Sequence, residues 1–136
     1  MIIDSSALVA VLRGEPDRKL YIEKLADGGR MSVANWVEAS IVAESRGAVA
    51  DLDALVSESS IELVPVSVEQ ARAARSAYRR FGRGRGSRAQ LNFGDCFAYA
   101  LAITEDDELL FKGDDFTHTD VVSALPTASP VSPSSP

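Results

Sequence analysis

Acidic residues at four separate places in the sequence are the strongest candidates for chemistry. Asp4 ends an apolar run, Glu38 and Asp95 lie near the starts of two expected helices, and Asp114-Asp115 follow a second apolar run. Each also has a structural interpretation: Asp4 as a helix cap, Glu38 and Asp95 in capping boxes that begin at Asn35 and Asn92, and the Asp pair as a turn. However, Asp4 and Asp95 border segments that should be buried, and buried carboxylates need a partner.

A bound divalent cation would compensate the negative charges of several such acids in one cleft. The sequence places no lysine or arginine close to Asp4, Glu38 or Asp95 that would pair with them locally. Carboxylate oxygens suit Mg²⁺ or Mn²⁺. Zinc is disfavoured because the chain has one histidine and one cysteine. The acids therefore predict a site for a hard divalent cation.

The arginines are concentrated in one segment of an otherwise acidic chain. The net charge of −6 argues against a protein that coats nucleic acid by bulk electrostatics. Even so, ten consecutive residues, 79–88, hold five of the fourteen cationic side chains. Within them, Arg83, Arg85 and Arg88 directly precede the segment of Asp95 and could deliver a polyanion to it. The alternative is a solvated loop that contacts nothing specific.

Apolar periodicity and turn residues indicate the elements that must position these side chains. We expect strands over residues 1–3, 30–33, 61–66 and 108–111, a further edge strand at 121–122, and helices over 7–12, 17–26, 35–46, 49–59, 68–81 and 92–104. Strands that alternate with helices predict an α/β fold with a mainly parallel sheet of four or five strands flanked by helices. Ligands of such folds bind beyond the carboxyl ends of the strands, so Asp4 and the Asp114-Asp115 pair should share a cleft.

Length and composition fit one domain, residues 1–125, followed by a Pro/Ser-rich tail, residues 126–136, that we expect to be disordered. No stretch approaches the ~20 apolar residues of a membrane span, and the apolar N-terminus has no signal-peptide pattern. Because Cys96 is the only cysteine, no internal disulfide forms, and we expect a cytoplasmic protein with no membrane partner.

Four other residues have mainly structural interpretations. Cys96 is expected to be a buried small hydrophobe, and His118 a surface loop residue. The aromatic residues Trp36 and Phe93 are expected in the core rather than as platforms for stacking bases.

Four segments, in this order, resemble the motifs of a known family. They are Ile2–Leu12, Met31–Ser40, Leu91–Ala102 and Leu109–Phe116, the last followed by Thr119-Asp120. Together they resemble PIN-domain nucleases, specifically the VapC toxins of bacterial toxin–antitoxin pairs. The resemblance spans residues 1 to about 124 and implies a three-layer PIN-like fold.

The resemblance also implies roles for individual residues. The catalytic acids would be Asp4, Glu38, Asp95 and Asp115, with Asp114 as an alternative for the fourth, Asp4 and Asp95 as the metal ligands, and Ser6 and Asn92 as orienting residues. The implied activity is Mg²⁺-dependent endoribonuclease cleavage by metal-activated water, with Mn²⁺ as a substitute. The implied partners are an RNA substrate, a VapB-like antitoxin and a second copy of the chain.

Two other functions remain as alternatives. An α/β phosphatase-like enzyme would use Asp4 as a nucleophile, but Ser6 stands two residues on, where such enzymes have a second aspartate. A non-catalytic module that only binds a partner is disfavoured by the complete set of acids.

Overall fold

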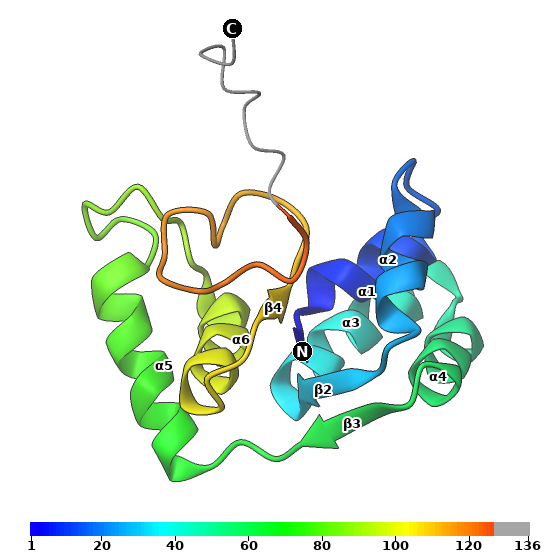
Figure 1. Cartoon of the computed structure of the whole chain (residues 1–136), viewed down its shortest axis with the longest axis horizontal. Coiled ribbons are helices and arrows are strands. Elements are labelled where there is room, and N and C mark those ends of the chain that lie inside the picture. Colours follow the sequence, from blue (N-terminus) through cyan, green and yellow to red (C-terminus); the bar gives the residue numbers. More distant parts are fainter. Residues whose placement is uncertain (127–136) are drawn as a thin grey trace, which may run out of the picture.

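The computed structural model describes residues 1–126, which form ten elements (Figure 1). The strands are β1 (Ile2–Ile3), β2 (Gly29–Ser32), β3 (Ile61–Val64) and β4 (Leu109–Leu110). The helices are α1 (Ser5–Leu12), α2 (Arg18–Leu25), α3 (Val33–Arg46), α4 (Val49–Glu58), α5 (Val68–Phe81) and α6 (Phe93–Thr104). Apart from Pro126, the expected tail lies outside the described residues.

The strands form one parallel sheet in the order β3-β2-β1-β4. Ile2 pairs with Arg30 of β2 on one side and with Leu109 of β4 on the other. The predicted α/β fold with a mainly parallel sheet is therefore confirmed. Residues 121–122 do not form the expected edge strand; that region has only one isolated bridge, between Leu109 and Ser123.

Helices cover both faces of the sheet, with α5 and α6 on one side and α1 to α4 on the other (Figure 1). Neighbouring strand residues point to opposite faces, so Ile2 and Leu109 belong to the core beneath α5 and α6, while Ile3 and Leu110 belong to the core beneath α1 to α4. All four are fully buried, and each contributes roughly 1.5–3 kcal/mol to folding. This three-layer arrangement fixes β1 and β4 rigidly against both cores.

Helix α3 begins earlier than the sequence predicts. The expected N-cap was Asn35, but the structure starts the helix at Val33, after Ser32, whose hydroxyl accepts a hydrogen bond from the Ala34 N–H at 3.3 Å. Serine is an equally good N-cap, and its position at the end of β2 lets the helix start directly from the strand. Asn35 and Glu38 therefore lie inside the helix and are free for other contacts.

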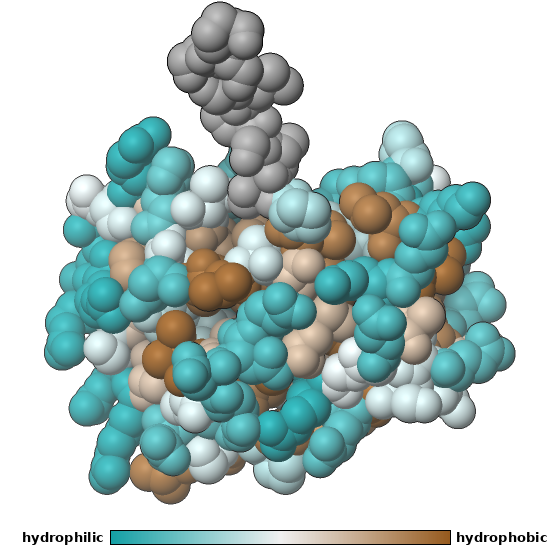
Figure 2. Space-filling view, viewed as in Figure 1, coloured by the Kyte–Doolittle hydropathy of each residue, from teal (hydrophilic) through white to brown (hydrophobic). Residues whose placement is uncertain are grey.

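The face shown in Figure 2 is mostly hydrophilic, with apolar side chains in separate patches. Within residues 1–126, no helix is long and apolar enough to cross a membrane. Cys96 is buried and unpaired, and His118 is exposed, as expected.

Candidate active site

The acids predicted from the sequence follow strands that lie side by side. Asp4 comes directly after β1, and Asp115 follows β4 by a short loop. Glu38 lies on α3, which starts where β2 ends. Because these three strands are adjacent and parallel, their carboxyl ends meet at one edge of the sheet. The remaining acid, Asp95, reaches the same edge from the first turn of α6.

Asp4 is buried and only half satisfied. Its side chain is 2% exposed, and Oδ2 accepts a hydrogen bond from the Ser6 N–H at 3.0 Å, which caps α1. Oδ1 has no hydrogen-bond partner among the described residues. Burial raises the pKa of Asp4 from 3.8 to about 6; hydrogen bonds from Ser6 oppose the rise, and the charge of Glu38 adds to it. The capping role is therefore real, but it leaves one buried carboxylate oxygen without a partner.

Asp95 is held by a reciprocal capping box at the start of α6. Its Oδ2 accepts a hydrogen bond from the Asn92 N–H at 3.0 Å, and its own N–H donates to Asn92 Oδ1 at 2.9 Å. Burial, together with the charges of Asp4 and Asp115, raises the pKa of Asp95 to about 8, despite the opposing hydrogen bond from Asn92. Asp4, Asp95 and Asp115 are thus close enough to destabilise one another's charges.

The structure separates the two candidates for the fourth acid. Asp115 is partly buried and acts on the pKa of Asp95. Asp114 is exposed and lines a different hollow, beside Tyr21 and Phe111. Asp115 therefore lies near the buried Asp95, whereas Asp114 faces a different hollow.

Glu38 is connected to Asp4 through the start of α1 and to Asp95 through the start of α6. Its Oε1 accepts hydrogen bonds from Ser5 Oγ at 3.0 Å and from Asn35 Nδ2 at 2.9 Å. The same Asn35 amide donates to the backbone carbonyl of Gly94 at 2.9 Å, which joins α3 to α6. Glu38 is thus held between two helix starts, each beside one of the buried aspartates.

Ser6 links the first and last strands of the site. Its N–H donates to Asp4, and its Oγ accepts a hydrogen bond from the Lys112 N–H at 2.9 Å. The Lys112 ammonium is turned away to Glu15 and Asp17. None of the ion pairs found among residues 1–126 neutralises Asp4 or the other site acids.

The donor set fits a hard divalent cation in its chemistry. All four side chains offer carboxylate oxygens, and Asp4 Oδ1 is a buried acceptor without a donor. Within the described residues, no group of three or more acids, histidines or cysteines is already spaced to hold one ion. The fit to a hard cation therefore rests on the chemistry of the donors and on the unpaired buried oxygen of Asp4.

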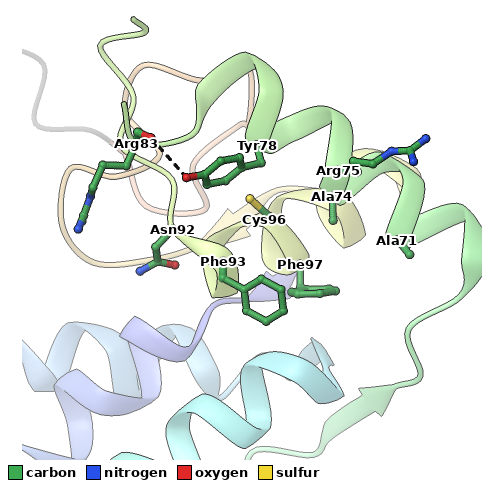
Figure 3. Close-up of a pocket in the computed structure, with 9 residues that line it drawn as sticks. All are labelled: Ala71, Ala74, Arg75, Tyr78, Arg83, Asn92, Phe93, Cys96 and Phe97. Atoms are coloured by element: carbon green, nitrogen blue, oxygen red, sulfur yellow. Dashed lines mark hydrogen bonds between the residues drawn. The ribbon is translucent and has the colours of Figure 1, made fainter. Parts of the chain in front are cut away.

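The arginine segment leads to a groove between α5 and α6. The groove has a volume of about 590 Å³ and is lined mainly by apolar groups, with Arg83 and Asn92 at one end and Arg75 toward the other (Figure 3). Arg85 stacks over the Tyr78 ring at 5.6 Å. Arg88 is exposed and does not line the groove. Arg83 therefore lies at the same end of the groove as Asn92, the N-cap of α6.

This groove also corrects one expectation. Phe93 was expected in the core, but its side chain is 79% exposed and packs edge-on against Phe97 with 5.0 Å between ring centroids. As the first residue of α6, Phe93 points into the groove, and burial begins at Gly94. Trp36 packs against the core, as expected.

Sequence reasoning missed three residues of the site: Ser5, Asn35 and Gly94. Ser5 and Asn35 stand beside predicted acids in the chain, but their contact partners are 33 and 59 residues away. The one available signal was the amide-bearing Asn35 three residues before Glu38, which we interpreted as a cap.

Comparison with known proteins agrees with this geometry. The sequence model of the PIN domain family matches residues 1–122. The chain therefore belongs to the PIN-domain family, and within that family its relatives are VapC ribonucleases. The ribonuclease VapC28 of Mycobacterium tuberculosis is 49% identical over 130 residues, which cover 92% of this chain and 98% of that protein. The ribonuclease VapC of Mycolicibacterium smegmatis is 49% identical over 128 residues, with 90% and 98% covered.

Solved structures show the same fold at low sequence identity. The crystal structure of M. tuberculosis VapC20, a toxin that cleaves the sarcin-ricin loop, has a TM-score of 0.73 at 14% identity and covers 92% of this chain and 98% of that one. A toxin-antitoxin complex from Klebsiella pneumoniae has a TM-score of 0.66 at 17% identity, with 90% and 95% covered. The predicted family and three-layer fold are confirmed.

Proposed function

We propose that this chain is a divalent-metal-dependent endoribonuclease and the toxin of a toxin–antitoxin pair. The observation that carries the proposal is the pair of buried carboxylates, Asp4 after β1 and Asp95 at the start of α6. Their pKa values are raised to about 6 and about 8 at the same edge of the sheet. Such a pair costs folding stability unless it binds a cation, and the relatives that share the whole domain are named ribonucleases.

Asp4 Oδ1 and the Asp95 carboxylate would hold the cation, Mg²⁺ or Mn²⁺. When bound, the ion supplies positive charge against the scissile phosphate and makes water easier to ionise. The chain's own contribution is orientation: Ser6 fixes Asp4 through its N–H, and Asn92 fixes Asp95 in the capping box. Each aspartate would therefore be oriented before the ion binds.

Glu38 is the candidate general base. Ser5 and Asn35 both donate to its Oε1, whereas Oε2 receives no hydrogen bond from the described residues. Oε2 is thus available to accept a proton from the attacking water during in-line attack on the phosphodiester. Asp115 completes the negative cluster on the side of β4.

The RNA backbone needs positive charge to approach this acidic edge. Arg83, Arg85 and Arg88 lie on the loop between α5 and α6, next to Asn92, and are exposed to solvent. We assign them to binding the phosphates that flank the cleaved bond.

The proposal extends to partners and location. A VapB-like antitoxin and a second copy of the chain are the expected protein partners. Exposed apolar side chains such as Phe93, Ile41 and Leu20 provide surface for such contacts. A cytoplasmic location is supported by Cys96, the only cysteine, which is a free thiol.

The experiment compares purified wild type with D4N and D95N on a structured RNA substrate in Mg²⁺. We expect each variant to lose at least ~100-fold in cleavage rate, because each removes a ligand charge while keeping the shape of the side chain. The matched control is Asp27→Asn, at an exposed turn away from the site. Cleavage by D4N and D95N at the wild-type rate would refute the proposal. Hydrolysis of a phosphomonoester without RNA cleavage would favour the phosphatase-like alternative.

A further inference from the structure

Gly94 lies where the site leaves no room for a side chain. It is buried in the first turn of α6, between Phe93, which points into the groove, and Asp95. A Cβ built on Gly94 would overlap the carboxylate carbon and both oxygens of Glu38, all well inside 3.0 Å, and these are its three nearest obstacles. The Glu38 carboxylate therefore rests directly on the backbone of α6.

Two hydrogen-bond donors hold the Glu38 carboxylate in this position against Gly94. Ser5 Oγ and Asn35 Nδ2 both donate to Oε1 at 3.0 and 2.9 Å, and the Asn35 amide also donates to the Gly94 carbonyl at 2.9 Å. Asn35 is fully buried, and its Oδ1 has no partner among residues 1–126. Burying an unpaired oxygen costs stability. The two hydrogen bonds of the Asn35 Nδ2 group offset that cost, and they fix the orientation of the amide.

We infer that Gly94 is a positioning residue: by having no side chain, it lets Asn35 and Ser5 hold the Glu38 carboxylate against the start of α6, next to Asp95. This inference rests on the proposed ribonuclease function and assigns the placement of Glu38 to three residues outside the predicted acid set. The positive end of the α6 dipole favours the negative charge that is held there.

Replacing Gly94 with alanine has two opposing effects on stability, so the inference can be tested without metal or RNA. In an unobstructed helix, alanine is more stable than glycine, because glycine loses more backbone entropy on folding. With Glu38 present, the new methyl group must instead push the carboxylate off its donors. The sign of the effect of Gly94→Ala therefore depends on residue 38.

The first experiment is a double-mutant cycle in EDTA, read as melting temperature. We expect G94A to lower the melting temperature of the wild type and to raise that of E38A. E38Q keeps an obstacle of the same size, so G94A should lower its melting temperature as well. Equal effects of G94A in the wild type and in E38A would show that the two residues are not coupled and would overturn the inference.

The second experiment measures cleavage kinetics in Mg²⁺. G94A should lower kcat at least tenfold with little change in KM, and it should cause no further loss in the E38A background. S5A should lower kcat in the same way, whereas S40A, which removes a hydroxyl bonded only to the Trp36 carbonyl of its own helix, should not. Wild-type kcat in G94A, or multiplied losses in the double variant, would overturn the positioning role.

The two experiments separate the inference from the function on which it rests. If the wild type cleaves no RNA, the proposed function and the positioning role both fall, while the melting cycle still reports whether Glu38 and Gly94 touch. If the wild type cleaves RNA and the cycle shows no coupling, the proposed function stands and the inference falls.

Discussion

Asn92 and Asp95 cap each other: each backbone N–H donates to the other's side-chain oxygen, at 3.0 and 2.9 Å. This pairing uses Asp95 Oδ2 to start α6 and directs the carboxylate toward the carboxyl ends of the strands. Asp4 behaves in the same way, because one oxygen caps α1 and the other is left for the site. In this fold, capping therefore orients both of the carboxylates that we propose to bind the cation.

The raised pKa of Asp95 predicts how metal-free stability depends on pH. At pH values between 3.8, the ordinary pKa of an aspartate, and about 8, Asp95 keeps a proton in the folded protein that it has released in the unfolded chain. Stability is therefore highest below the lower value and falls as the pH rises toward the upper one. D95N removes this loss, and since one pKa unit is worth about 1.4 kcal/mol, we expect it to exceed wild type by at least ~2 kcal/mol at pH 8.

Urea unfolding in EDTA at several pH values measures this difference. D95N and wild type should converge only below about pH 3, because Asp95 is then protonated in both the folded and unfolded states. A wild-type stability that stays level across this range, or rises with pH as strongly as that of D95N, would contradict the shift.

Divalent cations should stabilise the folded chain through the same carboxylates. Adding Mg²⁺ or Mn²⁺ to EDTA-treated wild type should raise its free energy of unfolding, by about 2.7 kcal/mol at a concentration 100 times the dissociation constant. D4N and D95N should lose most of this gain. KCl at matched ionic strength is the control, and an equal gain with KCl would indicate simple screening.

Asp114 and Asp115 form a matched pair for testing the fourth acid. D115N should lower the cleavage rate at least ~10-fold, because it removes one carboxylate of the acidic cluster proposed to bind the cation, while D114N should stay within about twofold of wild type. Purified variants assayed side by side on one RNA give the comparison. The assignment would be reversed if D114N were the more impaired.

The arginine loop should determine RNA affinity more than the cleavage step. Replacing Arg83, Arg85 and Arg88 with alanine should weaken RNA binding and reduce the slope of log affinity against log salt by about two to three. The control replaces Arg13, Arg18 and Arg46, which are exposed elsewhere and change the net charge equally. Equal effects from both triple variants would mean that total charge, not this loop, binds the RNA.

The loop itself is less free than its composition implies. Its glycines predict a flexible connection, and Gly84 and Gly86 do adopt positive φ. Its base, however, is closed by hydrogen bonds from the Arg83 N–H to the Leu91 carbonyl and from the Leu91 N–H to the Phe81 carbonyl. The arginines are therefore carried on a turn whose ends are fixed to α5 and α6.

The sequence predicted the features that are set by local periodicity and by strand ends. Helix α5 has the predicted bounds, Val68–Phe81, because alanine-rich turns and the Ser67 cap are strong local signals. Asp4 and Asp95 were identified because acids next to apolar segments are conspicuous. The prediction of an edge strand at 121–122 was wrong, because two apolar residues do not distinguish a strand from a segment that only passes beside the sheet.

What could not be predicted depends on distant contacts. Asn35 has the same local pattern whether it caps a helix or bridges to Gly94, and only the packing of α3 against α6 decides between the two. Phe93 is apolar and has helical spacing, but its place in the first turn of α6 turns it into the groove. Likewise, nothing local distinguishes Asp114 from Asp115.

The pairing of β1 with β4 determines when the site can exist at all. Asp4 is made almost first, yet its N–H bonds to the Leu110 carbonyl, and Ser6 is joined to Lys112, 106 residues later. During synthesis, Asp4 therefore leaves the ribosome before its neighbours from β4 have been made. The acid cluster is complete only when the last strand docks, so the proposed site cannot be assembled on the ribosome before β4 has been made.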